Sequence, residues 1–152
     1  LEGPAMLRLP VILLLLFCAL AMATGCVKAD PKDLEIEQKA IAQLKANWNP
    51  AADTMIKKSE IFNYTWKIWV VDDFKAEDIK KFTEEAAKAF GQNARTNGKV
   101  NPTYDVQVFQ RMKNESTNKE GDVNVAKGVF HNGKEKTEVE LYGQGSSKFD
   151  YK

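Results

Sequence analysis

The hydrophobic residues of this chain fall into one unbroken run, which is followed by helical and then alternating patterns. The apolar run extends from Leu9 to Ala23 and covers roughly 15 positions, fewer than the 18 or so that a membrane-spanning helix needs. A single positive charge, Arg8, separates the run from Met6. This order is typical of a cleaved secretion signal, which we expect within residues 1–25, together with the few residues that precede Met6.

Two later segments have the spacing of amphipathic helices. Asp30 and Pro31 are typical of an N-cap and a first helical residue, and apolar residues then recur at helical spacing as far as Trp48. The second helix is expected from about residue 76 to residue 96, where Asn97-Gly98 ends it. Its apolar stripe consists of Ile79, Phe82, Ala86, Ala89, Phe90 and Asn93.

Alternation of apolar and polar residues predicts four strands. The first is expected over 62–71 and the second over 104–112, whereas residues 49–61 are expected to be irregular with one short helical turn. The last two strands flank Asn132-Gly133, a typical two-residue hairpin turn. The core side of the first strand is expected to carry Phe62, Tyr64, Trp66, Ile68 and Val70.

A two-residue turn also fixes the register of the last hairpin. It predicts His131 opposite Lys134 and Lys127 opposite Glu138. The face of this hairpin that carries Ala126, Gly128, Phe130, Thr137, Val139 and Leu141 is the better candidate for the core. Its small residues leave room for a helix to lie across it.

The predicted order is α-β-α-β-β-β, an α+β fold. We expect a four-stranded antiparallel sheet with the second helix packed across one face, plus an N-terminal helix. The expected division of the chain is a signal segment in 1–25, a lipidated N-terminus and short linker in 26–30, one domain in 31–143 and a flexible tail in 144–152.

Composition excludes two classes of protein. The chain has 152 residues, with 22 Lys and Arg against 21 Asp and Glu, so it lacks the basic surplus of a nucleic-acid-binding protein. Hydrophobic residues make up 43% of the chain, which is too many for an intrinsically disordered one. We therefore expect a globular domain that does not bind nucleic acid.

The two cysteines bear on export. Cys18 lies inside the apolar run, so only Cys26 remains after cleavage, and a disulfide framework is excluded. The segment Ala23-Thr24-Gly25-Cys26 resembles the lipobox of bacterial lipoproteins. The resemblance implies that Cys26 receives a lipid and anchors the protein to a membrane of the cell envelope, and Val27 at the next position favours the outer membrane. The alternative is plain secretion, since Ala21-Met22-Ala23 is also a signal-peptidase site.

The order of the elements after the first helix resembles the cystatin-like layout, in which a curved antiparallel sheet wraps around a helix. The resemblance would imply a secreted protease inhibitor. However, the family's Gln-x-Val-x-Gly hairpin loop is missing, since Gln107-Val108-Phe109 does not supply it.

The chain offers few parts for catalysis. His131 is the sole histidine and is expected beside a turn, so the usual His/Cys metal sites and Ser-His or Cys-His nucleophiles lack components. No nucleotide-binding glycine motif occurs. Four acids, Asp72, Asp73, Glu77 and Asp78, are explained as the end of a strand and the start of a helix. We expect no enzyme activity, no metal site and no cofactor.

A second apolar surface is the remaining candidate site. Trp69 points away from the core side of its strand, toward the side with Val71, Val125 and Tyr142. Either the first helix covers this surface with Trp48, or it binds a partner. The leading hypothesis is a non-catalytic envelope lipoprotein that binds another protein through these five residues. The alternative is a periplasmic carrier or sensor of a small apolar ligand.

Overall fold

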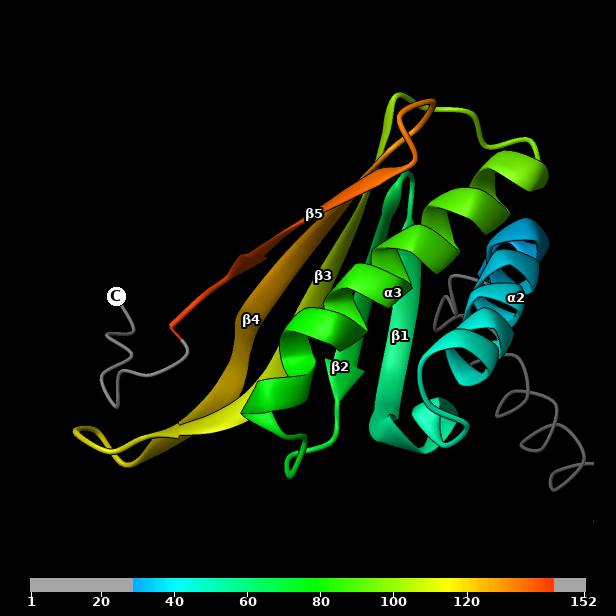
Figure 1. Cartoon of the computed structure of the whole chain (residues 1–152). Helices are drawn as coiled ribbons and strands as arrows, with labels where there is room; N and C mark the ends of the chain where they lie inside the picture. Colours follow the sequence, from blue (N-terminus) through cyan, green and yellow to red (C-terminus); the bar gives the residue numbers. More distant parts are fainter. Residues whose placement is uncertain (1–28, 144–152) are drawn as a thin grey trace, which may run out of the picture.

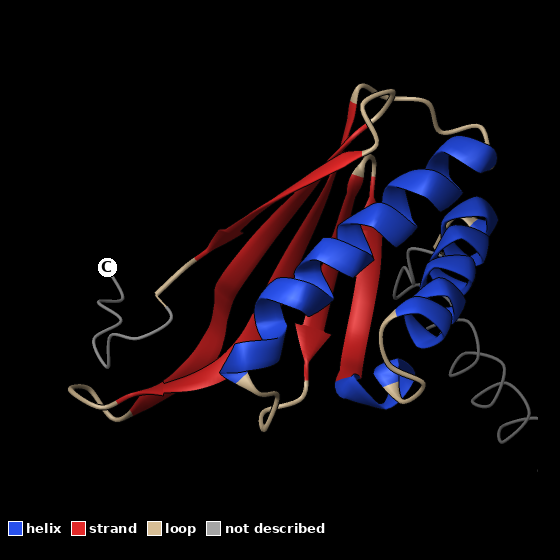
Figure 2. Ribbon diagram, viewed as in Figure 1, coloured by secondary structure: helices blue, strands red, loops and turns tan. Residues whose placement is uncertain are grey.

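The structure, a computed structural model, describes residues 29–143 as two helices packed on one side of a five-stranded sheet (Figures 1 and 2). The predicted signal segment, the lipidation site Cys26 and the predicted tail lie outside the described residues. In chain order the elements are α2 (Pro31–Asn47), the 3-10 helix η1 (Ala52–Met55), β1 (Ile56–Phe62), β2 (Thr65–Val70), α3 (Ala76–Thr96), β3 (Thr103–Asn114), β4 (Lys119–His131) and β5 (Lys136–Leu141).

The strands lie in the sheet in the same order as in the chain, from β1 to β5. Strands β2 and β3 run parallel, with Trp66 beside Val106 and Ile68 beside Val108, and the other three pairs are antiparallel. The parallel pair follows from the connection, because α3 carries the chain back along the sheet before β3 begins. The general α+β class is therefore correct, but the prediction of a purely antiparallel sheet was wrong. The layout also departs here from the cystatin-like one.

The prediction of four strands was wrong because it missed β1. Residues 56–61 were expected to be irregular, yet together with Phe62 they form β1, which pairs with β2 through a tight turn at Asn63 and Tyr64. Asn63 adopts a positive φ of 54°, a conformation that asparagine tolerates better than most residues. Tyr64 therefore lies in the turn and is exposed, not in a strand with its side chain in the core.

Both helices begin and end close to where the sequence places them. The Asp30 side chain accepts a hydrogen bond from the backbone N–H of Lys32 at 2.9 Å, and Pro31 is the first helical residue. Helix α3 lies across β3, β4 and β5, while α2 packs against α3 and reaches β1. A hydrogen bond from Ser59 to Glu37 joins α2 to β1. The two helices thus share one face of the sheet (Figure 2).

The core lies between α3 and the sheet and consists largely of aromatic rings. Phe90 contacts both Trp66 and Tyr104 with ring centroids 6.0 Å apart. A Cβ added at Gly128 would lie 3.0 Å from the side chains of Ala87 and Thr83 on α3. The prediction that a glycine on this strand leaves room for a helix is confirmed.

The β4–β5 hairpin differs from the prediction by two positions. His131 pairs with Lys136 and Lys127 with Glu140, because the connection contains the four residues 132–135, with positive φ at Gly133 and Glu135. A shift of two leaves each side chain on its predicted face, since strand side chains alternate with a period of two.

An irregularity in β4 changes a second assignment. The pairing with β3 shifts between Val108 and Phe109, so that Gln110 lies opposite Val123. A β-bulge of this kind reverses which residues face the core beyond it. Val123 therefore shares the side of Gln110 and not the side of Lys127, on which unbroken alternation along β4 would place it.

Candidate functional site

The face of the sheet that is turned away from both helices carries an aromatic pair. Trp69 alternates along β2 with the buried Ile68 and Val70, so its ring points to the opposite side. It stacks on Phe109 of β3 with ring centroids 5.0 Å apart and an interplanar angle of 17°. The ammonium group of Lys58 on β1 lies 4.1 Å from the centre of the Trp69 ring, within the range of a cation–π contact.

We call this surface the open face. It consists of Lys58, Glu60, Phe62, Thr65, Lys67, Trp69, Asp105, Gln107, Phe109, Lys127, Val129, Glu138, Glu140 and Tyr142.

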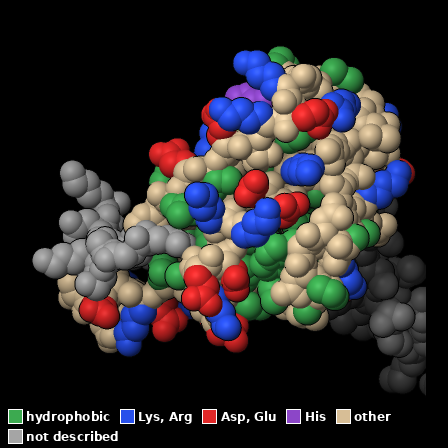
Figure 3. All heavy atoms as spheres, in the orientation of Figure 1, with side chains coloured by type: hydrophobic (Ala, Val, Ile, Leu, Met, Phe, Trp, Pro, Cys, Tyr) green, Lys and Arg blue, Asp and Glu red, His purple; other side chains and the backbone are tan. Residues whose placement is uncertain are grey.

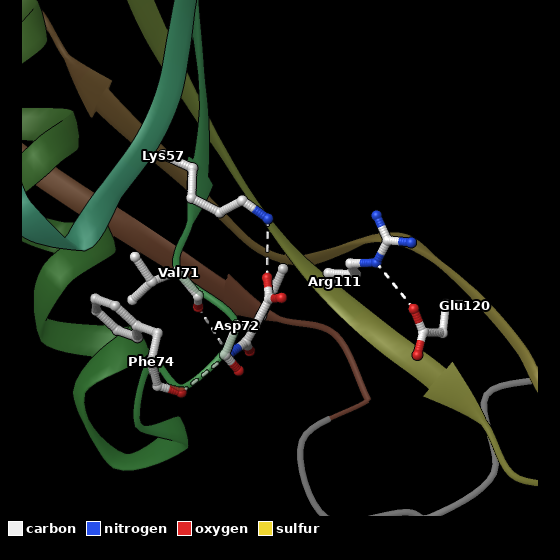
Figure 4. Close-up of polar contacts among 7 residues, drawn as sticks. Lys57, Val71, Asp72, Phe74, Arg111 and Glu120 are labelled. Atoms are coloured by element: carbon white, nitrogen blue, oxygen red, sulfur yellow. Dashed lines mark hydrogen bonds and ion pairs between the residues drawn. The ribbon is translucent and has the colours of Figure 1, made fainter.

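Charged groups around the aromatic pair have partners. Lys127 Nζ lies 3.1 Å from Asp105 Oδ2, and Lys67 Nζ lies 3.9 Å from Glu60 Oε1. The hydrogen bond to Asp105 raises the pKa of Lys127 above its usual value, against the opposing effect of burial. Farther along β3, Arg111 Nε lies 3.2 Å from Glu120 Oε2 (Figure 4). The open face is therefore an aromatic pair surrounded by balanced charges.

His131 lies at one edge of this surface. Its Nε2 is 3.4 Å from Glu138 Oε2, and the imidazole is half-buried, whereas its expected place beside the turn implied a solvent-exposed side chain. A hydrogen bond from Lys136 lowers the pKa of Glu138, with a smaller effect from His131. His131 thus lies beside Glu138, which also pairs with Lys136, at the edge of the open face.

The structure separates the five residues proposed for partner binding. Trp69 and Tyr142 lie on the open face, and Tyr142 Oη donates a hydrogen bond to Glu140 at 3.0 Å. Val125 is buried at the irregular position of β4. Val71 is half-buried at the end of β2, where its N–H donates to Met55 O at 3.0 Å.

Trp48 is partly buried and packs against the core on the helix side of the sheet. Its ring contacts Phe82 at 5.3 Å and Phe74 at 6.2 Å between centroids. Helix α2 thus packs on the same face as α3, and the hypothesis that it covers Trp69 was wrong. Sequence reasoning also missed Phe109. The feature that could have identified Phe109 is that it is an aromatic residue between Gln107 and Arg111 on an otherwise polar side of the second predicted strand.

A groove of about 420 Å³ lies where the end of β2 leads into α3. Its lining is Asn49, Thr54, Met55, Val71, Asp73, Phe74, Lys75 and Asp78. The neighbouring Asp72 forms an ion pair with Lys57, with Oδ1 and Nζ 2.9 Å apart (Figure 4). Within residues 29–143, no group of three His, Cys, Asp or Glu side chains is placed to hold a metal ion.

The ligand-carrier hypothesis needs a cavity between helix and sheet, and the described aromatic residues pack closely where α3 lies on β3 and β4. Phe90, Tyr104 and Phe130 are fully buried there. The Tyr104 ring contacts the rings of both Phe90 and Phe130. A Cβ at Gly91 would lie 2.2 Å from the Phe130 ring. Such close packing gives the carrier hypothesis no support.

Comparisons give no further information about the site. Within the part of the chain that the structure describes, no helix is long and apolar enough to cross a membrane. Comparison of the chain with protein-family models, with curated proteins and with solved structures finds no match.

Proposed function

We propose that this protein is a non-catalytic lipoprotein of the bacterial cell envelope, held at the outer membrane by a lipid on Cys26, and that it binds another protein through its open face. The observation that carries the proposal is the Trp69–Phe109 stack on a sheet face that neither α2 nor α3 covers.

The aromatic pair has the properties of an interface anchor. Tryptophan is enriched among the residues that contribute most to protein–protein affinity. The parallel stacking and the Lys58 ammonium restrict the Trp69 ring before binding, so little side-chain entropy is lost when a partner covers it. The paired charges of Lys127 and Asp105 farther along the same face match the polar rim of a typical interface.

Site-specific photo-crosslinking in cells tests the binding face. A photoreactive amino acid at Gln107, which lies two residues before Phe109 on the same side of β3, is expected to give a discrete protein adduct. The same amino acid at Lys80, exposed on α3, is the matched control and is expected to give none. Trp69→Ser is expected to abolish the Gln107 adduct. Equal adducts from both positions, or an adduct that persists in Trp69→Ser, would refute binding through this face.

The anchor has a separate test. Lipidation predicts a mature protein that begins at Cys26 with the added mass of a lipid and that fractionates with membranes, whereas Cys26→Ala is expected to lose the modification. Cleavage after Ala23 would instead leave an unmodified chain that begins at Thr24. That result would establish plain secretion.

A further inference from the structure

Large hydrophobic side chains are exposed mainly at one end of the domain. Among the described residues, five such side chains are exposed. Four of them are Leu34 (47% exposed), Phe62 (70%), Tyr64 (40%) and Val100 (66%), and we call these four the end patch. The fifth, Leu141, lies at the end of β5.

A chain of contacts places the segments that carry Leu34, Val100 and Tyr64 at the same end of the domain. Asp33, the neighbour of Leu34, forms an ion pair with Lys99, the neighbour of Val100. Tyr104 Oη donates to the Lys99 carbonyl at 2.6 Å, and the Tyr104 ring contacts the Tyr64 ring at 6.2 Å.

Phe62 completes the patch because it is the last residue of β1, next to the turn that contains Tyr64. The start of α2, the β1–β2 turn and the loop after α3 accordingly lie together at the upper end of Figure 1. Hydrophobic side chains reach the surface at that end in Figure 3.

The N-terminal segment leaves the domain at this same end. Ala29 lines a groove of about 500 Å³ together with Glu60, Ile61, Phe62 and Lys67. Three peptide steps separate Cys26 from Ala29, and at about 3.6 Å each they span at most about 11 Å. A lipid on Cys26 is therefore attached within about 11 Å of Ala29, which lines the same groove as Phe62, the most exposed of the five large hydrophobic side chains described above.

We propose that the end patch lies in the interfacial layer of the membrane that holds the Cys26 lipid. The proposal rests on the proposed anchor and adds the orientation of the domain. Aromatic and aliphatic side chains partition into this layer, and a lipid chain combined with a second apolar contact gives a more stable attachment than the chain alone. The tip of the β3–β4 hairpin lies at the opposite end (Figure 1), so it points away from the bilayer. The Trp69–Phe109 pair lies near the end of β2, away from Phe62, which borders the start of β2, so this part of the open face stays accessible to a partner.

Fluorescence quenching measures this orientation. The lipidated full chain is purified from bacterial membranes and reconstituted into vesicles of phosphatidylethanolamine and phosphatidylglycerol. An environment-sensitive fluorophore is attached to a cysteine introduced as Lys32→Cys, beside the end patch. The matched control is Glu115→Cys, exposed near the hairpin tip. With Cys26 modified, the introduced cysteine is the one free thiol of the mature chain.

Lipids that carry a quencher near the headgroup are expected to reduce the emission at position 32 by about twofold or more and to leave position 115 unchanged. Phe62→Ser is expected to weaken quenching at position 32, whereas Leu141→Ser is expected to leave it unchanged. Chains that float with the vesicles but show equal quenching at both positions would overturn the orientation and leave the anchor intact. Chains that do not float, with a reactive Cys26 thiol, would overturn the anchor and this inference with it.

Discussion

The close approach of α3 to β4 at Gly91 gives the sharpest test of the packing. A Cβ at this position would lie 2.2 Å from Phe130 Cδ1 and 2.8 Å from Cγ, and Phe130 is fully buried. Forcing extra volume into a packed core costs about 1–3 kcal/mol, while alanine in a helix is favoured over glycine by about 1 kcal/mol. With a contact this short we take the upper cost, so Gly91→Ala is expected to lower the free energy of unfolding by about 2 kcal/mol.

Urea unfolding followed by circular dichroism, on a chain that begins at residue 27, measures this change. At a slope of roughly 2 kcal/mol per molar, the midpoint is expected to fall by about 1 M. In a Phe130→Ala background the clash is removed, and Gly91→Ala is expected to become stabilising by about 1 kcal/mol. A fixed concentration of a stabilising osmolyte in all four samples keeps the Phe130→Ala proteins folded. A neutral Gly91→Ala in the native background, or the same loss in both backgrounds, would refute the steric argument.

Three further predictions concern single side chains. At the β1–β2 turn, Asn63→Gly is expected to change the free energy of unfolding by less than about 0.5 kcal/mol and Asn63→Val to lower it by about 1–2 kcal/mol, because φ is positive there; equal losses in urea would contradict this. Trp48→Ala is expected to cost about 3 kcal/mol, as for a core aromatic residue, and a near-neutral effect would return Trp48 to the list of surface candidates. Burial, and then Glu140, raise the pKa of Tyr142 above 10.0, so its neutral form supports the fold at pH values below 10 and this contribution is lost as the pH rises through the higher folded pKa. Titrations of tyrosinate absorbance are compared between the unsubstituted chain and Tyr142→Phe, and their difference reports Tyr142. The midpoint of this difference is expected above pH 10, and a midpoint at or below pH 10 would show that the pKa of the phenol is not raised.

The local patterns predicted the helices better than they predicted the sheet. The N-cap at Asp30 and the stop at Asn97-Gly98 are short-range signals, and both helices follow them. Strand β1 was missed because Lys57-Lys58 interrupts its alternation and because its turn lacks the usual glycine. The parallel pairing of β2 with β3 depends on where α3 returns the chain, and no local pattern encodes that.

The candidate site was predicted in part for a similar reason. Alternation placed Trp69 on the side of the sheet away from Trp66, and the structure confirms that placement. The partner of Trp69 was not predicted, because Phe109 becomes its neighbour through the parallel register of β2 and β3. Trp48 was assigned to a surface because the spacing along α2 does not say which face of the sheet the helix packs on.

Gln110 shows what alternation along a strand leaves out. The alternation puts Gln110 on the core side of β3, where the other side chains are mostly apolar. Its Nε2 lies 3.0 Å from the Phe74 carbonyl, 3.1 Å from that of Asp72 and 3.5 Å from that of Val71. These carbonyls belong to the connection between β2 and α3 (Figure 4), so one buried amide holds the loop that starts the crossover.

Two substitutions of Gln110 separate hydrogen bonding from packing. Gln110→Leu keeps the volume but removes the donor to the carbonyls of Phe74 and Asp72, so it is expected to lower the free energy of unfolding by about 1–3 kcal/mol at any neutral or acidic pH. In Gln110→Glu the ionised carboxylate would face those carbonyls, which raises its folded pKa above the unfolded value of about 4.3. The contribution of the protonated side chain of Gln110→Glu to stability is therefore fully present below about pH 4.3 and is lost as the pH rises through the folded pKa. Urea unfolding of Gln110→Glu is expected to show a deficit that shrinks on acidification relative to the unsubstituted chain, because the protonated carboxyl regains one donor. A deficit that is the same at pH 4 and pH 7, or a Gln110→Leu variant as stable as the original, would mean that the loop is held by packing and not by this amide.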